Sequence, residues 1–289
     1  MLLQQLLNGI TQGSIYALMA IGFSVVLGIV GLVTFVHGEV IMIGAFAGFY
    51  AITLFHANVV VALLAGFAAS WVLGSIIERV AYRPFRRSPE HIALICTIGA
   101  SIILKNLGQA VFGTETQLVP DLFGDRFFML GGLRVTFLQA AVLATVVAMC
   151  VLLQQLLYRT RLGISLRAVS MDKDAAALLG VNINRAISIG NSVGCALGGV
   201  AGVLLGMYYN SVNPVMGAEA GMKAFAAAVL GGLTSIPGAA LGGLLLGIFE
   251  NMGVALFSSG YRDIIAFLIL ISVLLVRPSG ILGRREERV

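Results

Sequence analysis

Charge is scarce in this sequence. Only 11% of its 289 residues are charged, whereas 59% are hydrophobic and the mean hydropathy is +1.00. An average soluble domain is about 25% charged. No Lys or Arg precedes Arg79, so the N-terminus lacks the basic segment that opens a signal peptide. This composition excludes an ordinary soluble domain and predicts a protein that crosses a membrane several times.

Residues that carry out catalysis or bind metals are also few. Cys96, Cys150 and Cys195 each lie in or beside an apolar run without paired spacing, which indicates packing and neither a disulfide framework nor a metal site. None of the three lysines follows a glycine, so the chain has no GxxxxGK[ST] phosphate loop. The HExxH and GxSxG motifs are absent as well. We therefore expect no enzyme activity, no metal and no cofactor in this chain.

The apolar runs are continuous, whereas the strands of a membrane barrel would alternate in polarity, so we predict an all-α polytopic membrane protein. At about 20 residues per crossing, we expect roughly eight to nine transmembrane helices in one domain over 1–289. The predicted spans are 7–27, 40–54, 59–77, 92–112, 136–157, 186–209, 224–249 and 264–276. Ser-Ile-Pro-Gly at 235–238 interrupts the run 224–249, which is either two short spans or one span and a half-helix.

Basic residues gather in three parts of the chain. They are Arg79, Arg83, Arg86, Arg87, Arg159, Arg161, Arg167, Lys173, Arg185, Arg284, Arg285 and Arg288. Because positive charge is retained on the cytoplasmic side of a membrane, we place these segments there, where they can also attract anionic lipid. This pattern gives no indication of nucleic-acid binding. Residues 113–135, which are mixed in charge, suit the opposite side.

The loop 159–185 is the longest polar interruption of the chain. Within it we predict a short helix that begins at Asp174, continues through Ala175 and Ala176, and ends at Gly180. We interpret a short cytoplasmic helix between two membrane spans as a docking surface for another protein.

Glycine is abundant, with 36 residues, well above the usual share of about 7%. Gly194, Gly198, Gly202 and Gly206 recur every four residues and therefore form a groove along one helix face. Such grooves let helix backbones approach closely where lipid offers no hydrophobic gain. We favour packing within this chain; a seam with a partner subunit is the alternative.

Ionisable residues interrupt the apolar runs, although a charge at the bilayer centre costs about 2.5–3.5 kcal/mol. His37 and Glu39 follow a glycine-rich break and predict a discontinuous helix that lines a cavity, with a simple helix cap as the alternative. Glu219 and Lys223, spaced i,i+4, either form an ion pair on one helix face or line a pathway. We predict that these four residues line or gate a pathway.

Four segments together resemble the inner-membrane permeases of branched-chain amino acid importers, the LivH type of ATP-binding-cassette transporter. They are NGITQGSIYALMAIGFSVVLGIVGLVTFVHGEVIMIGA (8–45), ERVAYRPFRRS (78–88), RAVSMDKDAAALLGVNINR (167–185) and GMKAFAAAVLGGLTSIPGAALGGLLLGIFE (221–250). The family carries an EAAxxxG-like coupling helix that binds a cleft of the ATPase subunit. Asp174, Ala175, Ala176 and Gly180 lie on that pattern, although Asp replaces Glu and no Ile-x-Leu-Pro follows the glycine.

The resemblance implies a multi-pass protein of the bacterial cytoplasmic (inner) membrane that works in a complex. Its partners would be a second homologous permease, two ATPase subunits that use ATP and Mg, and a periplasmic or extracellular substrate-binding protein. The small-molecule substrate, a branched-chain amino acid, would pass between the two permeases. ATPase closure would move the coupling helix as a rigid body and so alternate access to the two sides.

Other functions stay open at the level of sequence. Importers of urea and short amides have closely similar permeases, and the sequence separates them poorly from amino-acid permeases. An ion-coupled secondary transporter would use Glu39, Glu219 or Glu250 for proton or sodium coupling. That mechanism, like a simple channel, has no use for the coupling-helix loop.

Overall fold

The computed structural model describes residues 2–31, 33–86, 88–124, 126–130, 133–256, 259–277 and 279–283. Over this part of the chain, seven helices are long and apolar enough to cross a membrane. The chain is thus an all-α polytopic membrane protein, as predicted. Arg87 and the basic tail with Arg284, Arg285 and Arg288 lie outside the described residues.

The long helices account for most of the predicted spans. They are α1 (Leu2–Val30), α2 (His37–Phe55), α3 (Val59–Ile77), α4 (Glu90–Phe112), α5 (Phe137–Arg159), α8 (Ile183–Tyr208) and α10 (Ile236–Leu256). A π-helical turn, η1 (Glu78–Tyr82), extends α3. The helices α6 (Arg161–Met171) and α7 (Lys173–Leu178) form the loop between α5 and α8, and the 3-10 turn η2 (Ser259–Tyr261) precedes the last helix.

Two helices, α9 (Met216–Gly231) and α11 (Arg262–Val276), have only 16 and 15 residues. They are shorter than a full crossing of about 20 residues, so the predicted number of eight to nine spans is not matched. The predicted break is present between α9 and α10, but it covers residues 232–235, and Ile236, Pro237 and Gly238 already belong to α10. Of the two alternatives for 224–249, the structure has a short helix followed by one full span.

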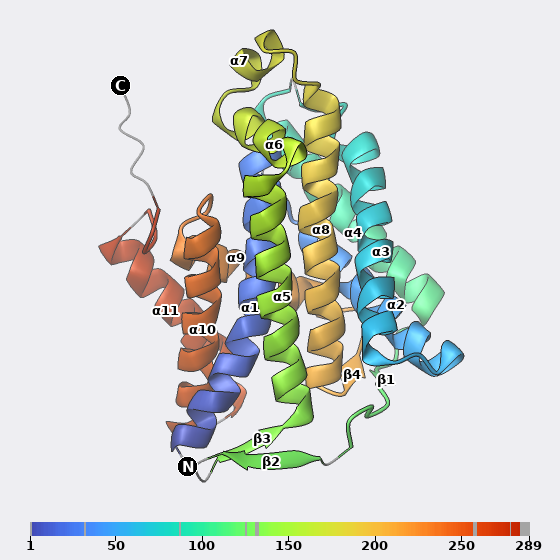
Figure 1. Cartoon of the computed structure of the whole chain (residues 1–289), viewed down its shortest axis with the longest axis vertical. Helices are drawn as coiled ribbons and strands as arrows, with labels where there is room; N and C mark the ends of the chain where they lie inside the picture. The colour runs from blue at the N-terminus through green and yellow to red at the C-terminus, as the bar shows by residue number, and fades with distance from the viewer. Residues whose placement is uncertain are drawn as a thin grey trace.

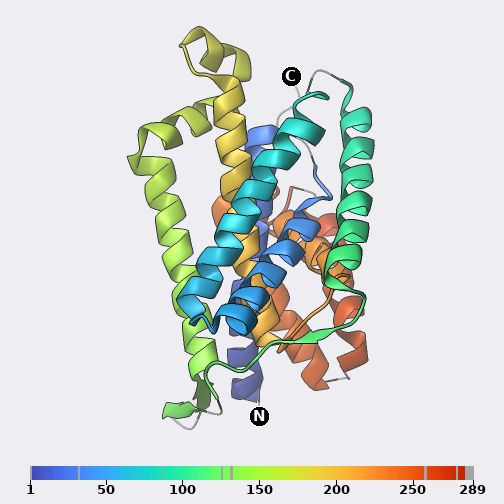
Figure 2. The same ribbon diagram turned by 90° about the vertical axis from the view of Figure 1, so that its right-hand side faces the viewer.

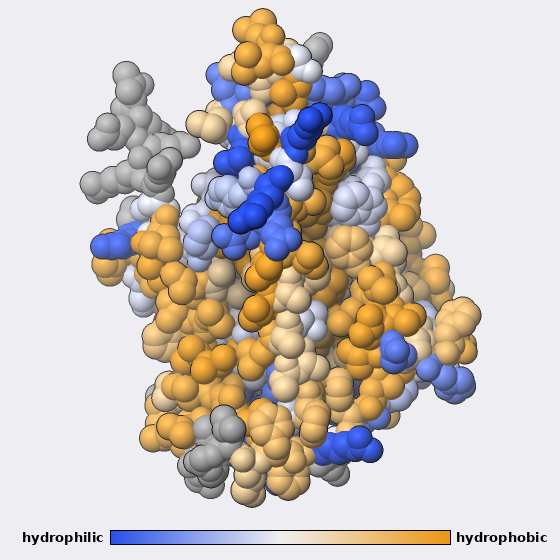
Figure 3. All heavy atoms as spheres, in the orientation of Figure 1, coloured by the Kyte–Doolittle hydropathy of each residue, from blue (hydrophilic) through white to orange (hydrophobic). Residues whose placement is uncertain are grey.

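The molecule has two distinct ends (Figure 1). The helices α6 and α7 lie at one end, while the N-terminus and a hairpin of β2 (Phe127–Leu130) and β3 (Leu133–Thr136) lie at the other. A second antiparallel pair joins β1 (Gln117–Leu118) to β4 (Ser211–Val212). Hydrophilic surface concentrates around the α6–α7 end, and a broad apolar surface lies below it (Figure 3). By the positive-inside rule this end is cytoplasmic, which places the N-terminus on the outer side.

The helices α1 and α8 form the centre of the molecule. In each, 89% of the most apolar segment is buried. Figures 1 and 2 show the other helices arranged around this pair, with α10 and α5 against α1 and with α2 and α3 against α8.

Glycines make these close contacts possible. A methyl group at Gly194 of α8 would lie 2.6 Å from the carbonyl oxygen of Gly22 in α1, and one at Gly202 would overlap the carbonyl oxygen of Ile41 in α2. A methyl group at Gly206 would lie 2.7 Å from the side chain of Val212 in β4. The four glycines of the groove are therefore buried against other elements of this chain.

Candidate functional site

The chain interrupts its helices between α1 and α2. The helix α1 ends at Val30, and α2 begins at His37. The His37 ring packs against Gly22, eight residues before the end of α1, or about 12 Å along the helix axis. Gly31 adopts a φ of +79°, a conformation that glycine accepts without strain, and so lets the chain turn back into the membrane. The discontinuous helix that His37 and Glu39 predict is therefore present.

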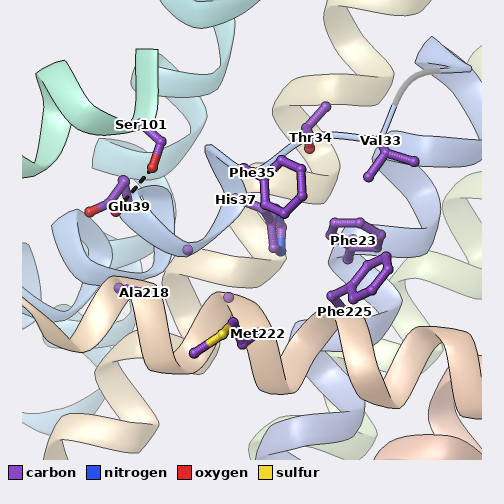
Figure 4. A pocket seen from close by; sticks show the side chains of 13 residues that line it. Phe23, Val33, Thr34, Phe35, His37, Glu39, Ser101, Ala218, Met222 and Phe225 are labelled. Carbon is purple, nitrogen blue, oxygen red and sulfur yellow. Dashed lines mark hydrogen bonds between the residues drawn. The ribbon is translucent and has the colours of Figure 1, made fainter. Parts of the chain in front are cut away.

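A cavity of about 240 Å³ lies where α2 begins, between α1, α4 and α9. Figure 4 shows that its two ends differ. Glu39 of α2 and Ser101 of α4 form one end, and Phe23, Phe225 and Val33 form the other. The cavity is therefore polar at one end and aromatic at the other.

Glu39 supplies the charge at the polar end. Its side chain is 2% exposed, and its Oε1 atom accepts a 3.2 Å hydrogen bond from the Ser101 hydroxyl group. Its Oε2 atom has no hydrogen-bond partner in the described part of the chain. This oxygen lies beside Gly217 of α9, where a methyl group would come within 2.8 Å of it. Among the described residues Lys105, one turn after Ser101, forms no ion pair with this carboxylate.

His37 lies between the two ends. Its ring is 2% exposed and makes an edge-to-face contact with Phe23, with ring centroids 5.8 Å apart. Within the described residues neither ring nitrogen makes a hydrogen bond of normal geometry, although the ring lies near the Met19 carbonyl group. His37 also fills the space beside Gly198, where a methyl group would lie 3.0 Å from Cε1 and Nε2. Gly198, a residue of the predicted glycine groove, therefore leaves the space that the ring of His37, a predicted pathway residue, occupies.

The aromatic end is built by side chains from separate elements. Phe23 of α1 and Phe225 of α9 pack edge to face, with ring centroids 5.7 Å apart. Phe35, from the segment before α2, and Met222, from α9, are about half exposed and line the middle of the cavity near His37 (Figure 4). Such a surface favours a small hydrophobic group.

A second polar site lies where α9, α10 and α11 meet. The Lys223 Nζ atom is 2.8 Å from Glu250 Oε1 and 3.1 Å from Asp263 Oδ1. Arg262 Nε lies 3.5 Å from the same Glu250 oxygen. Glu250 is fully buried, so two cations compensate a carboxylate that has left water.

The alternative in which Glu219 pairs with Lys223 is wrong. The lysine side chain extends instead to Glu250, because a fully buried carboxylate needs a counter-ion more than an exposed one does. Glu219 is exposed and borders, with Lys223, a separate cavity of about 460 Å³. The four predicted pathway residues are therefore split between two cavities, with His37 and Glu39 at one and Glu219 and Lys223 at the other.

Neutral polar groups extend the Glu250 cluster into α1. Gln12 lies within hydrogen-bonding distance of Tyr16, of Tyr209 and of Glu250, and its oxygen accepts a 2.8 Å hydrogen bond from Asn251. The sequence interpretation missed these partners. The one available signal was Gln12 and Tyr16, two polar side chains one turn apart within an apolar helix.

The cytoplasmic loop forms two short helices, with α7 at the tip (Figure 1). The predicted helix is present, but it begins one residue earlier than Asp174. Asp172 is its N-cap and accepts hydrogen bonds from the backbone amides of Asp174 and Ala175. Gly180, at φ +82°, follows the helix as predicted. Ala176 is buried, so it faces the protein and not an external partner.

The tip of α7 is apolar. Leu178 and Leu179, at the end of α7, are 90% and 82% exposed, and the neighbouring Met171, the last residue of α6, is 87% exposed. Figure 3 shows this apolar tip above the hydrophilic surface of the cytoplasmic end. Large apolar side chains this exposed, on an ordered helix outside the membrane, indicate a protein-binding surface.

Ion pairs and hydrogen bonds fasten this loop region to the membrane helices. Arg86, after η1, pairs with Glu78 and donates a 2.7 Å hydrogen bond to Asn184 at the start of α8. Lys173 lies near Arg86, and burial, followed by repulsion from Arg86, lowers the pKa of the lysine. Arg86 is thus held by two partners, whereas Lys173 is exposed and contacts the Val30 carbonyl group through its Nζ atom.

Over the described residues, no group of His, Cys, Asp or Glu side chains could hold a metal ion. The site features are instead a broken helix at membrane depth, buried charges between helices and an ordered cytoplasmic loop. Together they define a membrane transport protein of the permease class.

The family model of the "Branched-chain amino acid transport system / permease component" matches residues 5–274. The chain is 45% identical to the high-affinity branched-chain amino acid transport system permease protein BraD of Pseudomonas aeruginosa, over 98% of this chain and 96% of BraD. It is also 45% identical to the corresponding protein LivH of Escherichia coli K12, with the same coverage of both chains. No solved structure matches significantly. The chain therefore belongs to the family of branched-chain amino acid transport permeases.

Proposed function

We propose that this protein is the permease subunit of an ATP-binding-cassette importer that moves branched-chain amino acids across the bacterial cytoplasmic membrane by alternating access. The observation that carries this proposal is the 45% identity to BraD and LivH over 98% of the chain. A match of this length includes every predicted membrane span as well as the cytoplasmic loop. It therefore favours a shared transport mechanism as well as a shared fold.

The proposed complex contains a second permease, two ATPase subunits and an external substrate-binding protein. ATP and Mg act in the ATPase subunits, and this chain itself carries no cofactor. The α7 helix, with Asp174, Ala175, Ala176 and Gly180, enters the ATPase cleft through its exposed apolar tip. Ala176 holds α7 in place, and Leu178 and Leu179 make the contact.

The loop is well placed to transmit motion to the cavity. Lys173 contacts the carbonyl group of Val30 at the end of α1. The chain that follows Val30 supplies Val33, Thr34 and Phe35 to the cavity wall. Displacement of α7 would therefore shift one wall of the cavity directly, which is the rigid-body type of coupling that alternating access requires.

The secondary-transporter alternative is weakened by the arrangement of the carboxylates. Glu250 is compensated by Lys223 and Arg262, and Glu219 is exposed at another cavity. Among the carboxylates of the described residues, only Glu39 combines burial with an unpaired oxygen. The urea and short-amide alternative is disfavoured by the aromatic end of the cavity, since these substrates have little apolar surface.

Affinity purification from the native membrane, followed by mass spectrometry and reconstitution, tests the proposal. We expect recovery of a second permease and of ATPases with phosphate loops, and ATP-dependent leucine uptake once the co-encoded binding protein is added. Recovery of the chain alone, with uptake driven by an ion gradient, would contradict the proposal.

A further inference from the structure

We propose that the cavity at the start of α2 binds the amino acid during its passage. In this proposal Glu39 Oε2 accepts hydrogen bonds from the α-ammonium group, and the aromatic end holds the hydrophobic side chain. The inference rests on the proposed function, because the ligand class follows from it. It adds a specific binding site within this chain.

The first argument is the unsatisfied carboxylate oxygen. Glu39 is almost fully buried, and only one of its two oxygens has a hydrogen-bond partner among the described residues. A buried, unpaired carboxylate is costly, so its retention here indicates a partner that is present during function. The neutral hydroxyl group of Ser101 cannot neutralise the Glu39 carboxylate, and within the described part of the chain Lys105 forms no ion pair with it. An ammonium group, with three donors and a positive charge, is the group that this oxygen lacks.

The second argument is the neighbouring helix end. The α2 helix has no side-chain N-cap, and Gly38 in its first turn lines the cavity. The amide groups of a first helical turn lack acceptors within the helix and favour negative charge. The carboxylate of an amino acid, two bonds from its ammonium group, can use these donors while the ammonium group contacts Glu39.

The third argument is the shape of the rest of the cavity. Beyond the polar end, Phe23, Phe225, Val33 and Met222 form an apolar wall (Figure 4). The volume of about 240 Å³ lies below the range of roughly 300–1,000 Å³ that is usual for drug-sized ligands. A charged end, an apolar end and a small volume together select a small hydrophobic amino acid.

The cavity also has a means of release. Val33 and Phe35 belong to the segment that follows Val30, and Val30 is bonded to Lys173 of the cytoplasmic loop. Movement of the loop therefore changes the aromatic end, while Glu39 and Ser101 stay on α2 and α4. The site can be opened without breaking its polar end first.

Photolabelling tests the site directly. The intact permease–ATPase complex, in lipid nanodiscs without binding protein, is irradiated with a diazirine analogue of leucine and mapped by mass spectrometry. We expect label on peptides that contain Phe23, Met222 or Phe225, and we expect excess leucine to remove it. Glu39→Gln should reduce the label about ten- to hundredfold. Glu115→Gln, the same change at an exposed outer position, should leave it unchanged.

Two further measurements distinguish a loss of ligand recognition from a loss of the folded structure. 4-Methylpentanoate, which is leucine without its amino group, should compete poorly with the label, whereas leucinamide, which keeps the amine, should compete. Phe225→Trp, which narrows the aromatic end, should raise the leucine concentration needed for competition more than the valine concentration. If Glu39→Gln is not recovered as a folded complex, Phe225→Trp provides the test of the binding site.

The outcomes distinguish a failure of the proposed binding site from a failure of the proposed function. If the wild-type complex transports leucine with ATP, but the analogue labels other peptides or labels Glu39→Gln as strongly as wild type, the binding site is overturned and the proposed function stands. If the wild-type complex transports no branched-chain amino acid with ATP, the proposed function fails, and with it the assignment of the ligand.

Discussion

The Lys173 Nζ atom donates a 3.0 Å hydrogen bond to the carbonyl oxygen of Val30, the last residue of α1. This contact joins residues 143 positions apart, one in the cytoplasmic loop and one at the end of the central helix. The carbonyl groups of a final helical turn lack partners within the helix, and a cation there also interacts favourably with the helix dipole. Lys173 therefore caps α1 and couples it to α7.

Replacing this lysine should uncouple ATP hydrolysis from transport. Lys173→Met removes the capping bond, and loss of a bond from a charged group costs about 1.5–3 kcal/mol. We expect uptake by the reconstituted complex to fall about tenfold, while ATPase activity stays near its wild-type value. Lys173→Arg should keep most of the uptake. Arg161→Met, at an exposed position of α6, serves as the control. An equal loss of uptake in this control would show that the effect comes from removing any positive charge of the loop, and not from the contact between Lys173 and Val30.

The apolar tip of α7 gives a second prediction. Leu178→Arg places a charge on a side chain that is 90% exposed, so folding should tolerate it, whereas the ATPase contact should not. We expect co-purification of the ATPase subunits to be lost with normal recovery of the permease. Ala176→Arg, by contrast, alters a buried position and should abolish ATP-driven transport by displacing α7.

Leu162→Arg is the matched control for this experiment, because Leu162 is an exposed leucine on α6 away from the tip. Full ATPase recovery with Leu178→Arg would exclude the tip as the docking surface. Wild-type uptake by Ala176→Arg would exclude a coupling role for the position of α7.

Much of this architecture could be predicted from local sequence. Continuous apolar runs locate the spans, since only helices satisfy backbone groups in lipid. The break before His37 predicts the discontinuous helix, and Gly180 correctly predicts the end of α7. In each case the determining residues lie within one or two turns of the feature.

The partners of Lys223 could not be predicted in this way. Glu219 is its neighbour in sequence, whereas Glu250 and Asp263 reach it only because α10 and α11 pack beside α9. The N-cap of α7 was missed for a smaller reason. Asp172 and Asp174 are equally suitable residues, and only the backbone conformation shows that Asp172 is the cap.

The glycine groove gives a third prediction, which depends on what each glycine faces. Gly202→Ala would place a methyl group against the Ile41 backbone, which cannot move aside, and should lower thermal stability by about 1–3 kcal/mol or more. Gly198→Ala faces the His37 ring at 3.0 Å and should cost less; Gly198→Leu should cost more because it displaces that ring.

Gly28→Ala is the control, because no neighbouring atom lies within 4 Å of a methyl group at that position. Its melting temperature in detergent should equal or exceed that of wild type. Equal melting temperatures for Gly202→Ala and Gly28→Ala would show that the groove does not limit helix packing.

The buried ion cluster gives the last prediction. Lys223→Met leaves the fully buried Glu250 with Arg262 alone, at 3.5 Å, and Glu250→Gln leaves Lys223 with the more exposed Asp263. Removing one partner of a buried pair costs about 3–5 kcal/mol, so each single variant should melt well below wild type. The double variant should recover part of the loss, because neither charge is then unpaired.

Glu115→Gln, at an exposed position, is the control and should shift the free energy of unfolding by no more than about 0.5 kcal/mol. Thermal unfolding of wild type and the four variants in one detergent measures the coupling. Strictly additive losses would mean that Lys223 and Glu250 act independently, and that the cluster is held together by Gln12 and the tyrosines instead.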